Sequence, residues 1–495
     1  MLAPWVVEEM KTAKLNDKRL NARLATVISQ LAAHPTASIP AACGGYAEMT
    51  AAYRLFDNKK LSFENVLQPH INATRQRLAE QPVAILAQDT TETDLTRPNQ
   101  QVIGAGPMGG GSRRGVFLHP LYAFTSDGTP LGTVAATVWA RPDEPHLSSA
   151  ERQARRKALP IEQKESQRWI DMLRRSKELA AEMPSTRLIC VADSEADIYE
   201  YLAEAQAEPP RLDWIVRASG DRALQESGER PAEGGAHAEN GAAAGLLRAE
   251  VMKSEVRFTK TITVRERQPK VDCNARGRCQ PRKAREAEVE VRAARVTLRP
   301  PWRRDRELPP LAVNVVLVRE IAPPPDEDPV EWILLTSMPV TTIEDISAVI
   351  QYYCVRWMIE IVFRTLKSGC RVEERRFETI DRLLACLAVY LIVTWRTLFV
   401  CRLGRSLPDV SCEAVFEPAE WRSAWRFVRR SPPPPQPPRL AEMVRMVAQL
   451  GGYVNRKRKD EPGPQTVWLG LQRLHDITVC WQLFASEAET EQIVV

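Results

Sequence analysis

The sequence predicts an α/β protein with a mixed sheet and helical regions at both ends of the chain. Residues 83–88 and 187–192 are short apolar runs, and each is followed directly by an aspartate. Such runs are typical of buried parallel strands, whose carboxyl ends lie at the sheet edge where α/β proteins hold ligands. Residues 1–70 and 404–495 instead repeat their apolar residues at helical spacing.

The composition is that of a globular chain with several domains. Its 495 residues are enough for about three domains, and its 44% hydrophobic and 26% charged residues are ordinary proportions. The ten cysteines include no C-x2-C pair, so we expect reduced thiols and a cytoplasmic protein rather than a zinc site. The N-terminus is no signal peptide, and the most apolar run, residues 383–395, is too short to span a bilayer. We therefore expect a buried helix there and no membrane.

Residues 1–70 are predicted to form a small helical bundle. One helix would carry Arg19 and Arg23 on its outer face, while Leu24 and Val27 point inward. Cations on one side of such a bundle suit DNA, because neutralising phosphates supplies much of the binding affinity. Bundles with a basic rim that bind nothing are equally common, so this pattern alone leaves the choice open.

The first part of the sheet is predicted between residues 71 and 220. Asp89 ends one strand and Asp193 another, and a helix crossing between them would make the two strands parallel neighbours. The acids that follow Asp193 suit the start of a helix. Residues 104–112 are too rich in glycine for regular structure and lack the G-K-[ST] of a phosphate loop. The other expected elements are strands at 116–125 and 131–139 joined by an Asp-Gly turn, a helix at 161–183, and a strand at 213–218 that contains Arg217.

Residues 221–329 depart from this pattern and are predicted to form a β-rich insertion. Residues 226–245, rich in Gly, Ala and Glu, resemble a poorly packed loop. Residues 276–285 are strongly basic. A solvated loop and a loop that binds phosphate would both show this composition, and we favour phosphate binding. The expected strands of the insertion are 256–263, 286–296 and 311–319.

The chain returns to the sheet at residues 332–337, where Trp332 would ordinarily be a core residue. The final helix, residues 468–484, is amphipathic, and its apolar residues suit either docking onto the chain or self-association. The helices expected between them are 383–403, 421–428 and 440–450, with a proline-rich spacer at 431–438.

Residues 353–367 are predicted to form one amphipathic helix with a charged face. At about 100° per residue, five polar side chains fall within an arc of about 80°. A single carboxylate thus stands among cations. A solvated helix face with an i,i+4 ion pair would show the same pattern. The five side chains are Tyr353, Arg356, Glu360, Arg364 and Lys367.

Three carboxylates could converge if the helix packs beside the sheet edge. These are Asp89, Asp193 and Glu360. Acids cannot stand together unless cations neutralise them, and hard oxygen ligands suit Mg²⁺ or Mn²⁺. Two such ions are the usual device for in-line phosphoryl transfer.

At this point the motifs resemble a known family. The spacing Tyr353-x2-Arg356-x3-Glu360-x6-Lys367 resembles the Y-R-E-K signature of one hairpin-forming branch of bacterial insertion-sequence transposases. These are DDE enzymes with an RNase H-like core, in the retroviral-integrase superfamily. Residues 191–199 resemble that branch's second aspartate motif and residues 88–91 its first. The resemblance covers nearly the whole chain.

The resemblance implies a cut-and-paste DNA transposase, a metal-dependent nuclease and strand transferase. Asp89, Asp193 and Glu360 would hold two Mg²⁺, for which Mn²⁺ can substitute. The enzyme would bind terminal inverted repeats, cut the ends through a hairpin, and join them to target DNA. It would act as a homodimer, nucleoid-associated when bound to DNA.

The same resemblance assigns DNA contacts. Trp332 would stack on a base flipped out of the DNA end. The cations and the tyrosine would contact phosphates, and the N-terminal arginines would recognise the transposon end. Apart from Trp332, the predicted DNA-binding residues are Tyr353, Arg356, Lys367, Arg217, Arg364, Arg19 and Arg23.

The resemblance also gives a domain organisation, and two other functions stay open. An inactive DNA-binding protein descended from a transposase would keep the same motifs, and a glycan hydrolase with paired carboxylates would need no metal. The expected domains are a helical DNA-end-binding domain at 1–70, an RNase H-like core at 71–220 and 330–403, a β-rich insertion at 221–329, and a helical dimerisation region at 404–495.

Overall fold

The computed structural model describes most of the chain and divides it into two compact units. Unit 1 comprises residues 1–84, 89–147 and 357–495, and unit 2 comprises residues 85–88 and 148–356. The described residues are 2–109, 112–143, 148–207, 212–225, 245–264, 266, 282–303, 306–325, 327–454 and 461–491. Of the loops predicted at 226–245 and 276–285, residues 226–244 and 276–281 lie outside them, as do residues 455–460.

Unit 1 begins with the helices predicted for the N-terminal region. Helix α2 starts where the Asp17 carboxylate accepts the backbone N–H of Arg19, and its inward face is the predicted one, with Leu24 and Val27 fully buried. Arg19 is exposed and Arg23 is half-buried. The helices are α1 (Pro4–Glu9), α2 (Lys18–Ala33), α3 (Ile39–Ala42), α4 (Tyr46–Phe56) and α5 (Phe63–Ala79).

The strands of unit 1 surround β4 (Arg114–Thr125). It pairs antiparallel with β2 (Thr91–Asp94), β3 (Gly106–Pro107) and β5 (Pro130–Trp139). The predicted Asp127–Gly128 hairpin is confirmed, since β4 and β5 meet there and Gly128 has φ +86°. Helix α5 packs so closely on β5 that a Cβ on Gly132 would lie 2.2 Å from the hydroxyl oxygen of Thr74.

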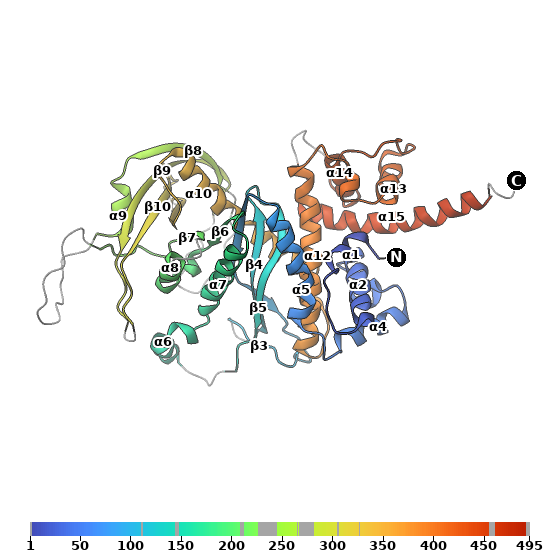
Figure 1. Cartoon of the computed structure of the whole chain (residues 1–495), viewed down its shortest axis with the longest axis horizontal. Helices are drawn as coiled ribbons and strands as arrows, with labels where there is room; N and C mark the ends of the chain where they lie inside the picture. Colours follow the sequence, from blue (N-terminus) through green and yellow to red (C-terminus); the bar gives the residue numbers. More distant parts are fainter. Residues whose placement is uncertain are drawn as a thin grey trace, which may run out of the picture. The chain divides into compact units, whose positions relative to one another are not determined.

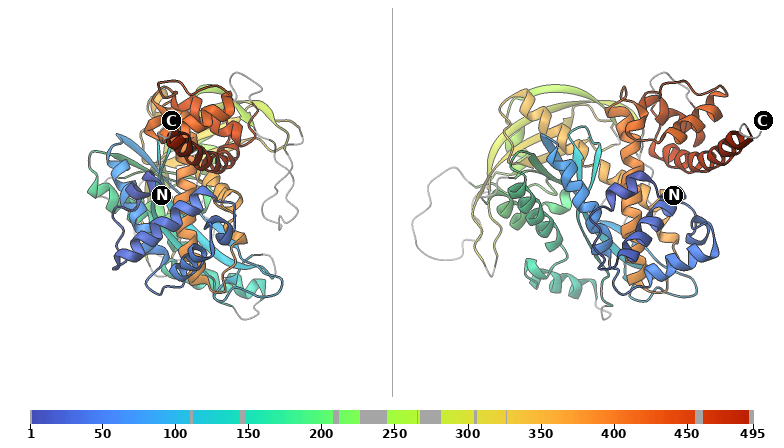
Figure 2. Two further views of the ribbon diagram at one scale, coloured as in Figure 1. Left: turned by 90° about the vertical axis from the view of Figure 1, so that its right-hand side faces the viewer. Right: turned by 45° about the vertical axis from the view of Figure 1, so that its right-hand side comes forward.

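Helix α12 (Ile380–Ser406) is the central core helix of unit 1, and it runs beside the N-terminal helices (Figures 1 and 2). The helix predicted at residues 383–403 is present and extends three residues further at each end. Arg382 pairs with Asp57, and Arg396 donates to the carbonyl of Val415 at 2.8 Å, so the helix continues through both charges. A charge does not end a helix when a partner lies within reach.

Among the residues that the structure describes, two helical stretches are long and apolar enough to cross a membrane by length and composition alone. They are Ile343–Glu374 and Ile380–Ser406. In the second, 83% of the most apolar window is buried inside the fold, as in the core helix of a globular protein.

Three helices complete unit 1: α13 (Pro418–Arg429), α14 (Leu440–Leu450) and α15 (Pro464–Glu491). Helices α14 and α15 touch backbone to backbone. A Cβ on Gly470 would lie 1.8 Å from the carbonyl oxygen of Val447, and one on Gly451 would lie 1.9 Å from that of Thr466. Only glycine permits this approach.

Unit 2 contains a mixed sheet. Strands β6 (Arg187–Ala192) and β7 (Asp213–Arg217) are parallel, and β1 (Val83–Gln88), whose residues 85–88 belong to this unit, neighbours β6. Beyond β7 the order is β11 (Glu331–Thr336), β10 (Leu311–Glu320), β9 (Arg285–Leu298) and β8 (Val256–Val264), all antiparallel. The three strands predicted for residues 221–329 are therefore present.

Two of the helices predicted for unit 2 are corrected by the structure. The helix expected at 161–183 begins six residues later, because a 3-10 turn at Ile161–Gln163 precedes α7 (Gln167–Glu182). The helix after Asp193 begins at Tyr199, since the Asp193 carboxylate caps a separate 3-10 turn, Ser194–Ala196. The others are α6 (Ser149–Ala158), α8 (Tyr199–Gln206), α9 (Leu247–Met252) and α10 (Ile343–Val355).

Candidate active site

Asp89 directly follows β1 and is half-buried. Its Oδ1 accepts the backbone N–H of Thr90 at 2.7 Å. The Thr90 hydroxyl lies 2.8 Å from Nδ1 of His119, a buried residue of β4. The carboxylate therefore stands on a backbone segment that unit 1 holds in place.

Asp193 occupies the equivalent position after β6 and is also half-buried. Its Oδ1 accepts the backbone N–H of Glu195 at 2.8 Å. The next residue, Ser194, accepts a hydrogen bond from Arg217 Nη2 at 3.2 Å. Unit 2 thus places the predicted DNA-binding Arg217 beside the predicted metal ligand.

The helix predicted for residues 353–367 is present but interrupted. Helix α10 ends at Val355, a turn follows at residues 356–357, and α11 runs only from Met358 to Arg364. A π-helical turn, Thr365–Gly369, then carries Lys367. Turns of that type inside helices are frequent at functional sites. The predicted apolar face does point inward, with Ile359, Val362 and Leu366 fully buried.

The break changes the exposure of the predicted polar face. Tyr353 is 0% exposed and Arg356 only 2%, whereas Glu360 and Arg364 are exposed and Lys367 is half-buried. The five side chains therefore do not form one solvated stripe.

Tyr353, Arg356 and Trp332 form an aromatic and cationic cluster in unit 2. The rings of Trp332 and Tyr353 lie 5.9 Å apart, and the guanidinium of Arg356 lies 5.8 Å from the Tyr353 ring. Burial raises the pKa of Tyr353, the charges of Arg217 and Arg356 oppose that rise, and the Asp193 carboxylate adds to it. Tyr353, Arg356, Arg217 and Asp193 are therefore close enough to interact electrostatically within one unit, and Trp332 contacts the ring of Tyr353.

Trp332 is half-buried and packs at the side of a small apolar cluster with Val264, Ala287 and Val330. It is thus only partly a core residue.

The acids beside Asp193 have other partners. Asp197, with a side chain only 1% exposed, accepts hydrogen bonds from Arg222 at 2.8 Å and from the backbone of Ser219 at 2.7 Å. Glu195 pairs with Arg168 at 3.0 Å. Both acids are thus paired with arginines within unit 2.

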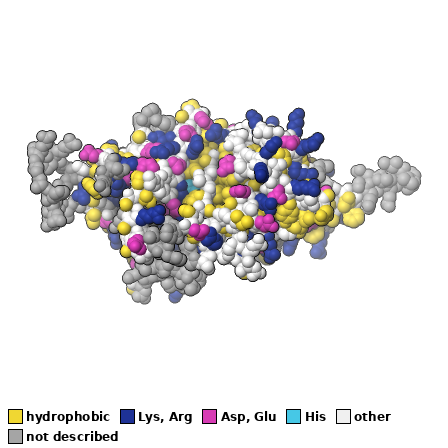
Figure 3. Space-filling model, turned by 90° about the horizontal axis from the view of Figure 1, so that it is seen from below, with side chains coloured by type: hydrophobic (Ala, Val, Ile, Leu, Met, Phe, Trp, Pro, Cys, Tyr) yellow, Lys and Arg dark blue, Asp and Glu magenta, His cyan; other side chains and the backbone are white. Residues whose placement is uncertain are grey.

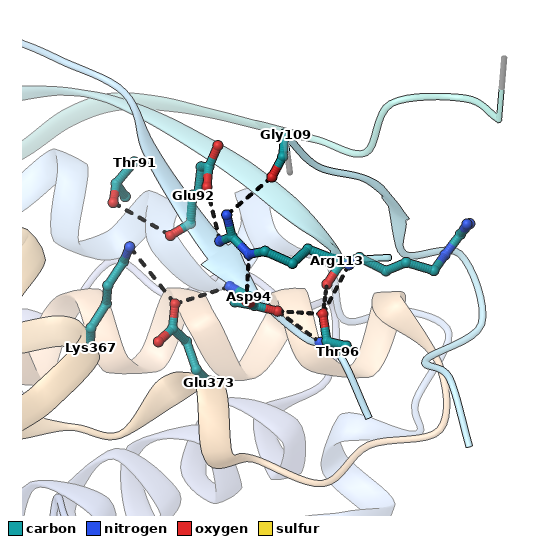
Figure 4. A network of polar contacts seen from close by, with 9 residues as sticks. Thr91, Glu92, Asp94, Thr96, Gly109, Arg113, Lys367 and Glu373 are labelled. Carbon is teal, nitrogen blue, oxygen red and sulfur yellow. Dashed lines mark hydrogen bonds and ion pairs between the residues drawn. The ribbon is translucent and has the colours of Figure 1, made fainter. Parts of the chain in front are cut away.

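A network around Lys367 was not predicted from the sequence (Figure 4). The Lys367 ammonium lies 3.7 Å from Oε1 of Glu373, which also accepts the backbone N–H of Asp94 at 3.0 Å. Burial alone would raise the pKa of Asp94, but hydrogen bonds from Thr96 and Arg113 hold it below its ordinary value. Arg113 spans Asp94 and Glu92, at 2.9 and 3.0 Å.

The oxygen donors of Asp89, Asp193 and Glu360 fit a hard divalent cation by their chemistry. Among the described residues, however, no three His, Cys, Asp or Glu side chains form a group that could hold a metal ion. Carboxylates repel one another until a cation neutralises them. The side chains of Asp89, Asp193 and Glu360 are therefore not required to lie close together when no ion is bound.

Three family models match successive parts of the chain. Residues 3–61 match a transposase DNA-binding model, residues 162–395 a transposase DDE domain, and residues 392–490 a transposase Tn5 dimerisation domain. The chain carries three transposase domains. The mixed α/β fold class with an RNase H-like core is thereby confirmed.

The transposase DDE match contains Asp193 and Glu360, whereas Asp89 lies between the first two matched ranges. A solved structure, the piggyBac transposase synaptic complex with hairpin DNA, is 11% identical to this chain with a TM-score of 0.28. The match covers 69% of this chain and 52% of the other, so this chain spans about half the length of that protein.

Proposed function

We propose that the protein is a cut-and-paste DNA transposase. It binds terminal inverted repeats, cleaves the ends by metal-dependent phosphoryl transfer through a hairpin, and joins them to target DNA. The observation that carries this proposal is the DDE-domain match over residues 162–395, within which Asp193 directly follows a buried strand and Glu360 stands on α11.

In this proposal Asp89, Asp193 and Glu360 hold the metal. Two Mg²⁺ ions, or Mn²⁺, would activate the attacking oxygen and stabilise the leaving 3′-oxygen. Each of the half-buried aspartates accepts a backbone hydrogen bond, Asp89 from Thr90 and Asp193 from Glu195, as carboxylates that ligate a metal commonly do. Exposed Glu360 supplies the third carboxylate from a helix.

The cations of the site contact DNA. Lys367 and Arg364 meet phosphates from the α11 region, and Arg217 does so from unit 2. Tyr353 and Arg356, which are 0% and 2% exposed, would reach a phosphate only after their cluster opens on binding DNA. Cations at a phosphate that is gaining charge also stabilise the transition state. Arg19 and Arg23 bind the transposon end, in support of which residues 3–61 match a transposase DNA-binding model.

We also propose the domain division given by the sequence. Residues 1–70 bind the DNA end, residues 71–220 and 330–403 form the catalytic core, and residues 221–329 are an insertion. Residues 404–495 dimerise the protein, supported by the dimerisation-domain match over residues 392–490.

The test is cleavage of a 5′-labelled duplex that carries the inverted repeat bordering the gene, with and without Mg²⁺. We expect a nick and then a hairpin only when the metal is present. Binding without cleavage under every metal condition would favour an inactive DNA-binding protein. Glycan hydrolysis that survives EDTA would favour the hydrolase.

Trp332→Ala is expected to slow hairpin formation by about 10-fold and to leave the first nick unchanged, because stacking on an aromatic ring offsets about 1–3 kcal/mol per unstacked base. A gel time course separates the two steps. Trp302→Ala is the matched control, since Trp302 is 82% exposed and lies outside the cluster. Equal slowing of nick and hairpin would make Trp332 a core residue only.

The dimer surface is narrower than the amphipathic pattern of residues 468–484 suggested. Trp468 and Leu474 are only 6% and 1% exposed because they pack inside unit 1. Exposed hydrophobic side chains gather on α15 near the C-terminal end of the chain (Figure 3). Here a groove of about 630 Å³ lies between α13 and α15. It is lined by Ser423, Arg426, Phe427, Arg430, Ile477, Trp481 and Phe484.

Phe484→Asp is expected to weaken the dimer by about 30-fold, since Phe484 is 69% exposed in the groove and aromatic anchors carry much of an interface's energy. Sedimentation of the protein and native gels of paired DNA ends measure this. Val454→Asp is the control, because Val454 is equally exposed (63%) but does not line the groove. An unchanged dimer in Phe484→Asp would place the interface elsewhere.

A further inference from the structure

We propose that Glu373 is a positioning residue that fixes the Lys367 ammonium relative to the strand following Asp89. This inference rests on the proposed function, in which Lys367 contacts DNA. Glu373 belongs to none of the motifs predicted from the sequence, and it acts through Lys367 rather than on the DNA.

The chain reverses directly after Lys367. The π-helical turn ends at Gly369, Arg371 adopts the left-handed conformation with φ +49°, and a 3-10 turn, Val372–Glu374, follows. Left-handed backbone is uncommon for a residue other than glycine and persists where the surroundings hold it. The reversal brings the Glu373 carboxylate back to 3.7 Å from the lysine that precedes it by six positions.

The backbone around Glu373 is clamped. Arg97 donates one hydrogen bond to the carbonyl of Glu373 at 3.1 Å and another to that of Arg375 at 2.6 Å. Arg375 is buried and donates in turn to the carbonyl of Pro35 at 2.7 Å. The carboxylate therefore projects from a segment with little freedom to move.

Glu373 also contacts β2. Its Oε1, the atom nearest Lys367, accepts the backbone N–H of Asp94 at 3.0 Å (Figure 4). Asp94 is the last residue of β2, a strand that begins two residues after Asp89. Arg113 holds the same strand through Glu92 and Asp94. One oxygen atom thus links the lysine to the strand that continues from the proposed metal ligand.

The Glu373 carboxylate can orient the Lys367 ammonium and still leave its N–H donors available to DNA. A separation of 3.7 Å is an electrostatic contact and too long for a direct hydrogen bond. The ammonium has three N–H donors, so it keeps donors for a phosphate oxygen while the carboxylate restrains its direction. Removing the charge should free the lysine, which would still bind DNA but from a less fixed position.

The experiment compares Glu373→Gln with wild type in single-turnover cleavage of the labelled inverted-repeat duplex. The glutamine oxygen can still accept the Asp94 N–H, so only the charge is lost. We expect cleavage to slow by about 10- to 100-fold, as misplaced catalytic groups do. Affinity for the duplex should stay the same or rise, since a negative charge near phosphate is removed.

Glu374→Gln is the matched control, because Glu374 is the neighbouring acid and is 67% exposed. In a Lys367→Met background, Glu373→Gln should cause no further slowing, since the residue it positions is gone. Wild-type cleavage by Glu373→Gln, equal slowing by Glu374→Gln, or an undiminished effect in the Lys367→Met background would each overturn the inference. If wild type itself does not cleave, the proposed function fails instead. Thermal melting shows whether each variant is folded.

Discussion

Asp193→Asn is expected to lower the rate of DNA-end cleavage by about 10³-fold or more while DNA binding persists. The amide oxygen can still accept the Glu195 N–H that the carboxylate accepts at 2.8 Å, so the turn after β6 should survive. What is lost is the negative charge that would hold a divalent cation. Asp89→Asn and Glu360→Gln should behave in the same way. Single-turnover cleavage and gel-shift affinity of the same labelled duplex measure the two properties.

Glu195→Gln is the control for this result. Glu195 is two residues from Asp193, but it pairs with Arg168 and its side chain is 59% exposed. We expect its cleavage rate to stay near that of wild type. Equal losses in both variants, or a parallel loss of DNA binding in Asp193→Asn, would point to damaged folding rather than to a lost metal ligand.

Asp197→Ala is expected to reduce the free energy of unfolding by about 3–5 kcal/mol, the usual cost of leaving one member of a buried ion pair alone. The Asp197 side chain is 1% exposed and accepts from Arg222 and from both the N–H and the hydroxyl of Ser219. The substitution leaves the donors of Arg222 and Ser219 without the acceptor that they bond in the folded protein. Urea unfolding followed by tryptophan fluorescence measures the loss, since Trp214 lies buried in the same unit.

Glu178→Ala is the comparison for Asp197→Ala. Its carboxylate pairs with Arg175 on the exposed side of α7 at 2.8 Å, and such surface pairs contribute about 0–1 kcal/mol. Similar losses in the two variants would show that the Asp197 pair is no more important than a surface pair.

Much of the fold could be predicted from local patterns. The inward face of α2, the hairpin of β4 and β5 and the strands of residues 256–320 follow from periodicity and turn chemistry, which act between near neighbours in the chain. The aspartates at the ends of β1 and β6 could be predicted for the same reason. The roles given to them remain proposals.

What could not be predicted depends on contacts between distant residues. The break at Arg356 follows from tertiary burial, since a guanidinium 2% exposed does not belong on the solvated face that helical periodicity assigned to it. The hydrogen bond from the Asp94 backbone N–H to the Glu373 carboxylate joins residues that are 279 positions apart, and neither residue belongs to a sequence motif. The six-residue reversal between Lys367 and Glu373 depends on a left-handed arginine, which no propensity would favour.

The glycine contacts between α14 and α15 mean that the last helix is not a detachable arm. Gly470 and Gly451 let the two backbones meet, so α15 covers the face of α14 that it contacts and keeps it from water. Removing α15 would uncover buried residues such as Val447 and Leu450, so shortened chains ending near Pro464 should aggregate rather than persist as monomers. A monomeric form is better sought by single substitutions in the groove.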